Sequence, residues 1–180
     1  MEVKGHNFTI GADPEVFVTE NDQIVSAHGL IEGTKDNPLP VEKGAVQVDG
    51  MALEFNIDPA HNFEEFNNNL DVVSKQLEGM IGDKKFCNAT SAIFDEKYLA
   101  SLPEEATELG CDPDWNAYTM SLNPAPDSSV NMRCTGGHVH IGGFFTDNPL
   151  SYKHLLDCSV LTRWLDVCLG QFSLFWDNDD

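Results

Sequence analysis

The sequence predicts an α+β domain over residues 1–180, with a largely antiparallel sheet and helices packed on one face. Short runs of alternating apolar and polar residues, bounded by Gly, Pro, Asn and Asp, occupy residues 7–60 and indicate strands. Residues 63–77 instead repeat apolar side chains at intervals of three and four, which indicates a helix. The order of strands, helix, irregular segment, strand and helix is typical of α+β domains.

Residues 7–60 predict several strands, which are connected by turns and one loop. Residues 7–29 predict a strand, a Gly/Pro turn and a hairpin with the tip ENDQ, and the Gly- and Pro-rich residues 29–44 predict a loop. Residues 45–60 predict two strands around an Asp-Gly turn. In the second of these strands, apolar and polar residues alternate, so that the two kinds fall on opposite faces. The apolar residues are Leu53, Phe55 and Ile57, and the polar ones are Glu54, Asn56 and Asp58.

The remaining chain predicts two longer helices, with a strand before the second. The apolar face of the first helix is formed by Phe63, Phe66, Leu70, Val73 and Leu77, and the helix is expected to end near Gly79 or Gly82. Residues 83–130 are less regular, with short helical segments near 95–101 and 103–109. Asp147 or Asn148 is predicted to cap the last helix, with Pro149 in its first turn. Because this helix is apolar on most sides, we expect it to be buried.

The composition limits the partners. The 180 residues carry a formal net charge of −20, which argues against nucleic acids and anionic membranes and suits hard divalent cations. No apolar segment resembles a signal peptide or reaches membrane-spanning length. The five cysteines form no CxxC pair, so we expect reduced, mostly buried thiols and a cytoplasmic location.

Four polar strand residues are candidates for a metal site. His138 and His140 in GGHVHIGG are two residues apart and share one face of a strand, while Val139 and Ile141 are expected to point toward a core. If the sheet brings the histidines to the strand glutamates, carboxylates with imidazole suit Mg²⁺ or Mn²⁺. Those glutamates are Glu15 and Glu54.

Several other chemistries have weaker support. A cupin site needs a glutamate soon after HxH, but here the next acid is Asp147. Amidohydrolases place HxH on an early barrel strand, whereas here it comes late in the chain. The sequence has no G-x-S-x-G elbow, no GxGxxG loop and no GxxxxGK[ST] loop. A metal-dependent hydrolase that uses the same His and Glu residues stays open.

Five segments, taken in order, resemble the phage-associated carboxylate–amine ligases (COOH·NH2 ligase type 2), amidoligases of the glutamine synthetase and glutamate–cysteine ligase superfamily. They are GADPEVFV, GTKDNP, VQVDGMALEFNIDPA, GCDPDWNAY and GGHVHIGG, and the resemblance covers most of residues 7–170. It implies a glutamine-synthetase-like catalytic fold. It also implies an ATP- and Mg²⁺-dependent ligase that joins a carboxylate to an amine through an acyl phosphate, in the cytoplasm of a bacterial host if the protein is phage-encoded.

The resemblance also implies roles for individual residues. Glu15, Glu54 and His138 match the positions that hold metal, and His140 matches the histidine nearer the ATP phosphates, so Glu54 and His140 are candidate catalytic residues. Two basic residues are candidates for phosphate or substrate-carboxylate contacts: Arg133, also a catalytic candidate, and Lys35. Asp49 and Asn56 are candidates for orienting the ligands or the substrate.

One departure from the family concerns the C-terminus. Family members run well beyond this point, with an Arg-rich stretch and a YG-like motif, so we expect a C-terminally truncated domain, with apolar surface exposed. A homo-oligomer or a partner chain that supplies the missing segment is then expected. Three functions stay open: an amidoligase acting on small-molecule or peptide carboxylates and amines, a non-catalytic metal-binding or interaction module of the same fold, and the metal-dependent hydrolase.

Overall fold

The computed structural model describes residues 8–109, 113–125, 130–143, 148, 150–173 and 175. These residues belong to two compact units. The first unit comprises residues 1–110 and 127–143, and the second comprises residues 111–126 and 144–180. The prediction of one domain stays a prediction.

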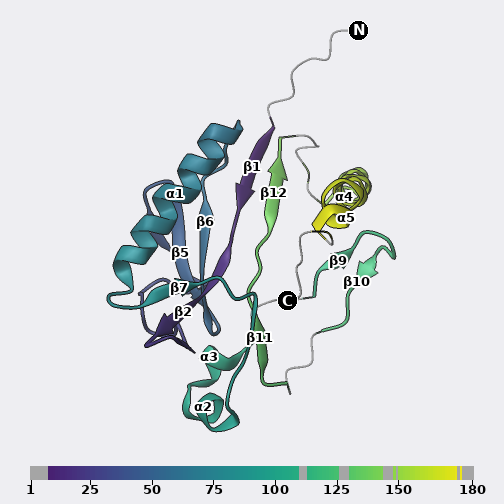
Figure 1. Cartoon of the computed structure of the whole chain (residues 1–180). Coiled ribbons are helices and arrows are strands. Elements are labelled where there is room, and N and C mark those ends of the chain that lie inside the picture. Colours follow the sequence, from purple (N-terminus) through teal and green to yellow (C-terminus); the bar gives the residue numbers. More distant parts are fainter. Residues whose placement is uncertain are drawn as a thin grey trace. The chain divides into compact units, whose positions relative to one another are not determined.

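The first unit is built on a six-stranded antiparallel sheet (Figure 1). The strand order is β3-β2-β6-β5-β4, and β7 pairs with β2 beside this path. The strands are β2 (Glu15–Glu20), β3 (Gln23–Val25), β4 (Leu39–Val41), β5 (Gly44–Asp49), β6 (Ala52–Ile57) and β7 (Lys85–Cys87). The predicted hairpin tip is confirmed: Asn21 and Asp22 join β2 to β3 with φ of 51° and 63°, the left-handed conformation that two-residue hairpin turns require.

Two short antiparallel ladders complete the strands of this unit. β1 (Thr9–Ala12) pairs with β12 (Val139–Gly142), and the two run side by side in Figure 1. β8 (Ser91–Ile93) pairs with β11 (Met132–Cys134). Mixed helices and mostly antiparallel strands confirm the α+β class, whereas the glutamine-synthetase-like fold stays a prediction.

Helix α1 (Phe63–Met80) packs on one face of the sheet. Asn62 caps it, because its side chain accepts a hydrogen bond from the Glu65 N–H. The helix presents Val73 and Leu77, both 0 % exposed, to the sheet. The strand side chains of this core alternate along β2, β5 and β6: Val18, Val46, Leu53, Phe55 and Ile57. Phe63 does not belong to the apolar face, because it is 80 % exposed at the start of the helix.

Gly44 lies on β5 at a point where both β6 and α1 come close to its backbone. A Cβ at this position would lie 1.9 Å from the backbone oxygen of Asn56 and 3.0 Å from Cγ2 of Val73 on α1. Only a hydrogen fits there, so the glycine lets β5 lie against β6 and under α1 at the same time.

A smaller apolar cluster lies on the opposite face of the sheet. Phe17, Met51, Ala52 and Phe94 are buried in it, and the rings of Phe17 and Phe94 meet edge to face with centroids 6.0 Å apart. Helices α2 (Glu96–Ser101) and α3 (Glu104–Thr107) follow, as the sequence predicts. Leu99 and Leu102 pack against the cluster, which therefore covers one end of this face.

The second unit contains one long helix and a short hairpin. Helix α4 (Tyr152–Leu165) continues through the π-helical turn η1 (Asp166–Gly170) into α5 (Gln171–Ser173), and β9 (Trp115–Asn116) pairs with β10 (Ser121–Leu122). Arg163 Nε donates to the carbonyl of Ala117 at 2.9 Å, and Tyr118 donates to Asp166. These bonds hold the hairpin to the helix.

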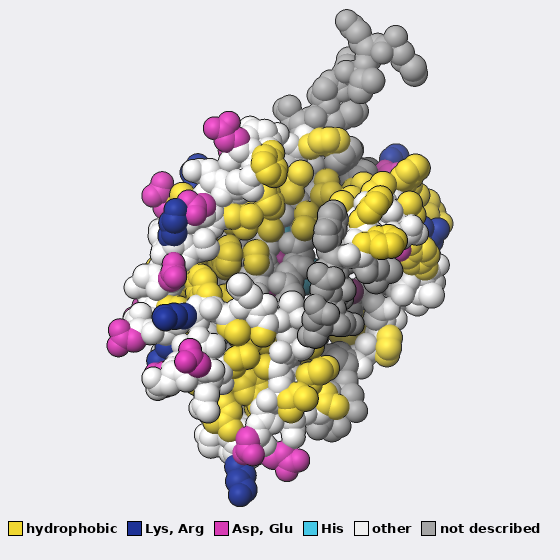
Figure 2. All heavy atoms as spheres, in the orientation of Figure 1, with side chains coloured by type: hydrophobic (Ala, Val, Ile, Leu, Met, Phe, Trp, Pro, Cys, Tyr) yellow, Lys and Arg dark blue, Asp and Glu magenta, His cyan; other side chains and the backbone are white. Residues whose placement is uncertain are grey.

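Two predictions about α4 are wrong. Its cap is Ser151, whose hydroxyl accepts from the His154 N–H, while Asn148 accepts from Leu150 in the preceding turn. Asp147 and Pro149 lie outside the described residues. The helix is not buried either, because Ser159 is its one buried residue and Trp164 is 65 % exposed. Apolar side chains gather over α4 in Figure 2.

Three smaller expectations also need correction. The Gly- and Pro-rich segment 29–44 is not entirely a loop, because its residues 39–41 form the edge strand β4. Val139 is 64 % exposed and does not enter a core. Two of the thiols expected to be buried, those of Cys134 and Cys168, are exposed. In the described part of the chain, no helix has both the length and the apolar character needed to cross a membrane.

Candidate metal-binding site

Three neighbouring strands place a row of polar side chains on the sheet face opposite α1. Gln47 on β5 is directly opposite Glu54 on β6, and Glu54 is directly opposite Glu15 on β2. Residues opposite each other in an antiparallel pair point to the same face. Asp49 lies two residues beyond Gln47, so it points to this face as well.

These strands bring three carboxylates together. Glu15, Asp49 and Glu54 each offer one oxygen within 4.8 Å of the other two, and all three side chains are half-buried. Two of them were predicted as metal ligands, and the third, Asp49, was predicted to orient ligands. His138, the other predicted ligand, is not in this group. Oxygen donors at this spacing suit a hard divalent cation.

The pKa of Glu54 is shifted by its surroundings. Burial raises the pKa of its carboxyl above the ordinary value, and the hydrogen bond from Gln47 acts in the opposite direction. The negative charges of Asp49, Asp13 and Glu15 raise the pKa further. A bound cation would offset this repulsion. Without a cation, the raised pKa favours retention of a proton on the Glu54 carboxyl.

Gln47 directly positions the Glu54 carboxylate. Its Nε2 donates to Glu54 Oε2 at 2.6 Å, and the residue is only 8 % exposed. Its chain neighbours Val46 and Val48 point to the α1 face and pack in the apolar core. The alternation of the VQVD segment therefore fixes both the core and the polar row.

Asp13 joins the two histidines. Its carboxylate lies 3.3 Å from Nδ1 of His138 and 3.0 Å from Nε2 of His140, and it also accepts the backbone N–H of His138 at 2.6 Å. The two imidazole centroids are 6.3 Å apart, which confirms that the rings share one side of the segment. Both rings are more than half exposed, whereas Asp13 is 15 % exposed. The largely buried Asp13 carboxylate thus orients both exposed rings.

The glycines before the histidines allow two chain segments to meet closely. Gly136 exchanges two hydrogen bonds with Glu15: its N–H donates to Glu15 Oε2 at 2.9 Å, and its carbonyl accepts the Glu15 N–H at 3.0 Å. A Cβ on Gly137, which has φ of 154°, would lie 3.0 Å from Cα of Pro14. The glycines therefore permit backbone packing against the Asp13-Pro14 turn, and this packing links the histidine strand to the carboxylate group.

Lys35 lies at the edge of the carboxylate group. Its Nζ is 3.8 Å from Asp49 Oδ2 and its side chain is 57 % exposed. The loop that carries it is held to β5, because the carbonyl of Gly33 accepts the Val48 N–H at 3.0 Å, and Thr34 and Asn37 exchange backbone bonds. The structure thus places this predicted phosphate contact beside the candidate metal ligands.

Arg133 lies elsewhere in the unit and is 7 % exposed. Its Nη atoms donate to the carbonyls of Val130, Met132 and Thr107 at 2.8–2.9 Å. The guanidinium therefore ties β11 to the end of α3. Its predicted contact with phosphate stays a prediction, and the bonds observed here are structural.

A cavity of about 490 Å³ adjoins the histidine strand. It is lined by residues of β1, β6 and β12, and its polar side chains are Thr9, Asn56 and His140. Asn56 is two residues from Glu54 on the same face of β6, so this cavity lies next to the carboxylate group along the strand. Its volume falls in the range of small-ligand sites.

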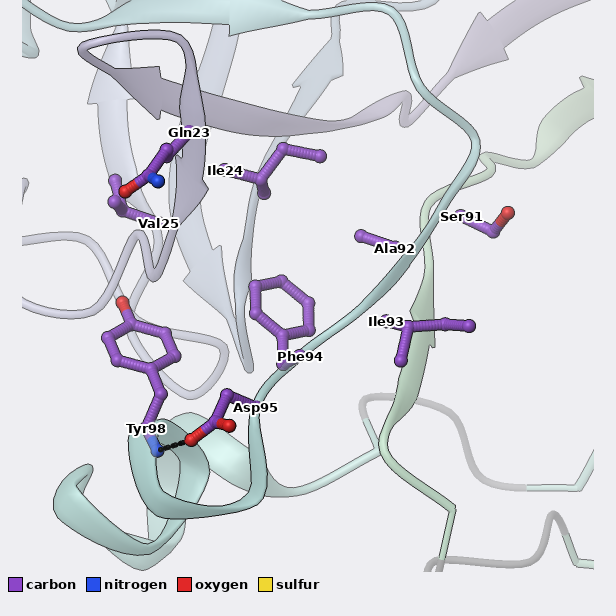
Figure 3. Close-up of a pocket in the computed structure, with 9 residues that line it drawn as sticks. All are labelled: Gln23, Ile24, Val25, Ser91, Ala92, Ile93, Phe94, Asp95 and Tyr98. Carbon is purple, nitrogen blue, oxygen red and sulfur yellow. Dashed lines mark hydrogen bonds between the residues drawn. The ribbon is translucent and has the colours of Figure 1, made fainter.

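A second cavity of about 610 Å³ lies between β3, β8 and α2 (Figure 3). The rings of Phe94 and Tyr98 stand side by side there, with centroids 6.1 Å apart. Asp95 is its one carboxylate, and that side chain already accepts the N–H groups of Lys97 and Tyr98 as the α2 cap. None of the predicted site residues lines this cavity.

Sequence reasoning did not select two residues of the site. Asp13 was covered only by the predicted Gly/Pro turn, and Gln47 was not selected. The signal for Gln47 was present, because it alternates with Val46 and Val48 in the same way that Glu54 alternates with its neighbours. No local pattern could reveal that Asp13 contacts both histidines, because the contact spans more than 120 residues of chain.

Comparison of the chain with known protein families, curated proteins and solved structures found no match.

Proposed function

We propose that this protein is an ATP- and Mg²⁺-dependent ligase that joins a carboxylate to an amine. The observation that carries the proposal is the convergence of Glu15, Asp49 and Glu54 from three strands, with oxygens within 4.8 Å of one another. Burying three like charges this closely is unfavourable without a counter-ion. A site built in this way supports a role in cation binding.

The donor set fits magnesium or manganese. Both ions prefer carboxylate oxygens and water in octahedral geometry. When bound, such an ion offsets the negative charge of phosphates during phosphoryl transfer. Glu15, Asp49 and Glu54 would hold it, and His138 lies on the adjoining segment. Asp13 keeps the imidazoles of His138 and His140 oriented toward their common side.

Fewer residues support ATP binding than support cation binding. Lys35 supplies a positive charge beside Asp49, and the 490 Å³ cavity offers Asn56 and His140 next to the carboxylates. Lys35 is flexible and more than half exposed, so it can reach a phosphate once a cation occupies the carboxylates. The cavity would then receive a neutral part of a substrate or nucleotide.

One observation favours a second candidate, a cation-binding module without turnover. Arg133, the predicted catalytic cation, is buried and donates to three backbone carbonyls. A ligase would need another positive charge for the transferred phosphoryl group. Exposed apolar side chains on α4 support the related expectation of a second copy or a partner chain.

Calorimetric titration of the full chain with ATP, with and without Mg²⁺, tests the proposal. We expect binding only with Mg²⁺, followed by ADP release when mixed amino acids are added. Glu54→Gln should lose the Mg²⁺-dependent binding, whereas Glu78→Gln, the same change at an exposed position on α1, should bind like the parent. Binding without ADP release would select the cation-binding module. Amide or phosphoester hydrolysis without ATP would select the hydrolase.

A further inference from the structure

Gln47 has a position that the proposed ligase does not explain by itself. It is the one uncharged member of the polar row Gln47, Glu54 and Glu15, and it is the most buried of the three. An amide that only filled space would leave two donors and an oxygen unsatisfied in a half-buried site. Here the amide instead makes a short hydrogen bond to Glu54.

This hydrogen bond engages a single carboxylate oxygen. Gln47 Nε2 donates to Oε2 of Glu54, which leaves Oε1 without that bond. If Glu54 chelated an ion through both oxygens, the positive end of the amide N–H dipole would be held close to the cation. The bond therefore favours coordination through one oxygen and disfavours chelation through two.

The position of the Gln47 side chain is fixed by its surroundings. The residue is 8 % exposed, and the backbone around it is fixed by the β5–β6 ladder in a register that places it opposite Glu54. Val46 and Val48 anchor the same strand in the core on the other face. The amide is thus held in place by the fold before any ion arrives.

Coordination through one oxygen discriminates between divalent ions. Ca²⁺ takes six to eight oxygens and commonly uses a carboxylate through both atoms, whereas Mg²⁺ and Mn²⁺ accept six ligands and keep several waters. Three carboxylates that each give one oxygen leave room for waters in an octahedral shell. With the same three oxygens, Ca²⁺ would need more waters to fill its larger shell and would lose the two-oxygen carboxylate contact that it commonly uses.

We propose that Gln47 is the residue that makes this site select Mg²⁺ and Mn²⁺ over Ca²⁺, by restricting Glu54 to one coordinating oxygen. This inference rests on the proposed cation-binding role of the three carboxylates. It assigns Gln47 a positioning role, because its amide acts on the ion only through Glu54.

The test measures dissociation constants for MnCl2 and CaCl2 on the full chain, by calorimetry and by the electron paramagnetic resonance signal of free Mn²⁺. Two variants remove the amide donor. Gln47→Leu leaves Glu54 free to chelate, and Gln47→Glu keeps the shape and adds a carboxylate. Partners of metal ligands typically change affinity by about 10- to 100-fold when they are replaced. We expect the preference for Mn²⁺ over Ca²⁺ to fall by about tenfold or more in both variants.

Gln76→Leu is the matched control. Gln76 also bonds through its side-chain amide, to the carbonyls of Glu42 and Val72, but it lies on α1 away from the carboxylates. It should lower stability without changing the ratio of the two dissociation constants. Thermal unfolding of each variant shows that the fold is retained.

The outcomes separate the two proposals. A parent that binds Mn²⁺ better than Ca²⁺, with the preference reduced in Gln47→Leu and Gln47→Glu, supports the inference. A parent that binds Mn²⁺, with the same preference in every variant, overturns the inference and leaves the proposed function intact. A parent that binds neither ion overturns both.

Discussion

The two faces of the six-stranded sheet come from the same strands but use burial in opposite ways. Toward α1, Val46, Leu53 and Phe55 pack with helix side chains in an apolar core. On the other face, Gln47 donates a hydrogen bond to Glu54, and one Glu54 oxygen lies within 4.8 Å of oxygens of Asp49 and Glu15. The α1 face gains free energy from apolar burial, whereas the carboxylate row, which shares its face with the smaller cluster around Phe17, places like charges together at a cost.

In the first unit, the residues that stabilise the fold and those proposed to bind an ion alternate along the same strands. Alternation along β5 and β6 allows a change on one face to leave the side chains of the other untouched. Substitutions of the apolar side chains toward α1 should therefore change the free energy of unfolding and leave ion affinity unchanged, and substitutions of the carboxylates should change ion affinity. Four experiments test this separation, and they are ordered by the size of the change that each should produce.

Leu77→Ala should have the largest effect. Leu77 is 0 % exposed between α1 and the sheet, and replacing a buried leucine with alanine removes apolar contacts and leaves a cavity. We expect a loss of about 2–5 kcal/mol in the free energy of unfolding, measured by urea denaturation. Leu122→Ala, at a residue that is 65 % exposed, is the control and should lose far less. A changed Mn²⁺ affinity in folded Leu77→Ala would show that the two faces are coupled.

The carboxylate face should make stability depend on pH. Because the folded pKa of Glu54 is raised, the folded state binds more protons than the unfolded state between the ordinary pKa and the raised one. The free energy of unfolding should therefore fall as pH rises through this window in metal-free buffer. Glu54→Gln should remove this slope and be more stable than the parent at neutral pH. An unchanged slope in Glu54→Gln would assign the pH dependence to other groups.

Asn62→Ala should have a moderate effect. Asn62 caps the helix that covers the apolar face, through its bond to the Glu65 N–H at 2.9 Å. The loss of such a cap costs about 1 kcal/mol. We expect a lower urea midpoint with an unchanged Mn²⁺ dissociation constant. Asn62→Asp, which can make the same bond, should restore the stability.

Lys35→Ala should have the smallest effect on stability and a visible effect on ion binding. The Lys35–Asp49 pair is 3.8 Å long at an exposed edge, and such pairs contribute about 0–1 kcal/mol. Removal of the positive charge should raise Mn²⁺ affinity severalfold at low salt and less at high salt. A lower affinity in Lys35→Ala would show that this lysine supports cation binding in another way.

Much of the first unit could be predicted from sequence because its strands and helix obey local rules. The alternation around Glu54, the Asp-Gly turn and the period of α1 are local patterns, and each forms the expected element. The edge strand β4 was missed because Leu39–Val41 lies in a Pro-rich segment with no alternation of its own. Its pairing with β5 depends on tertiary structure.

The site was harder to predict than the elements. Alternation showed that Glu54 is on a polar face, but the register that places Gln47 and Glu15 opposite it is a long-range property. The same limit applies to the start of α4, where Asp147 and Asn148 were the predicted caps and Ser151 was not selected. Only the backbone geometry shows that Ser151 makes the capping bond.

The absence of a side chain at Gly44 has a consequence for how this protein tolerates change. Any other residue at position 44 would place an atom against the backbone of β6 and the underside of α1. In a library that replaces every residue in turn, we expect this position to accept glycine alone, although it binds nothing and carries no chemistry. Strict invariance among descendants of this chain would thus mark position 44 as a point of assembly, and it should not be mistaken for part of the ion site.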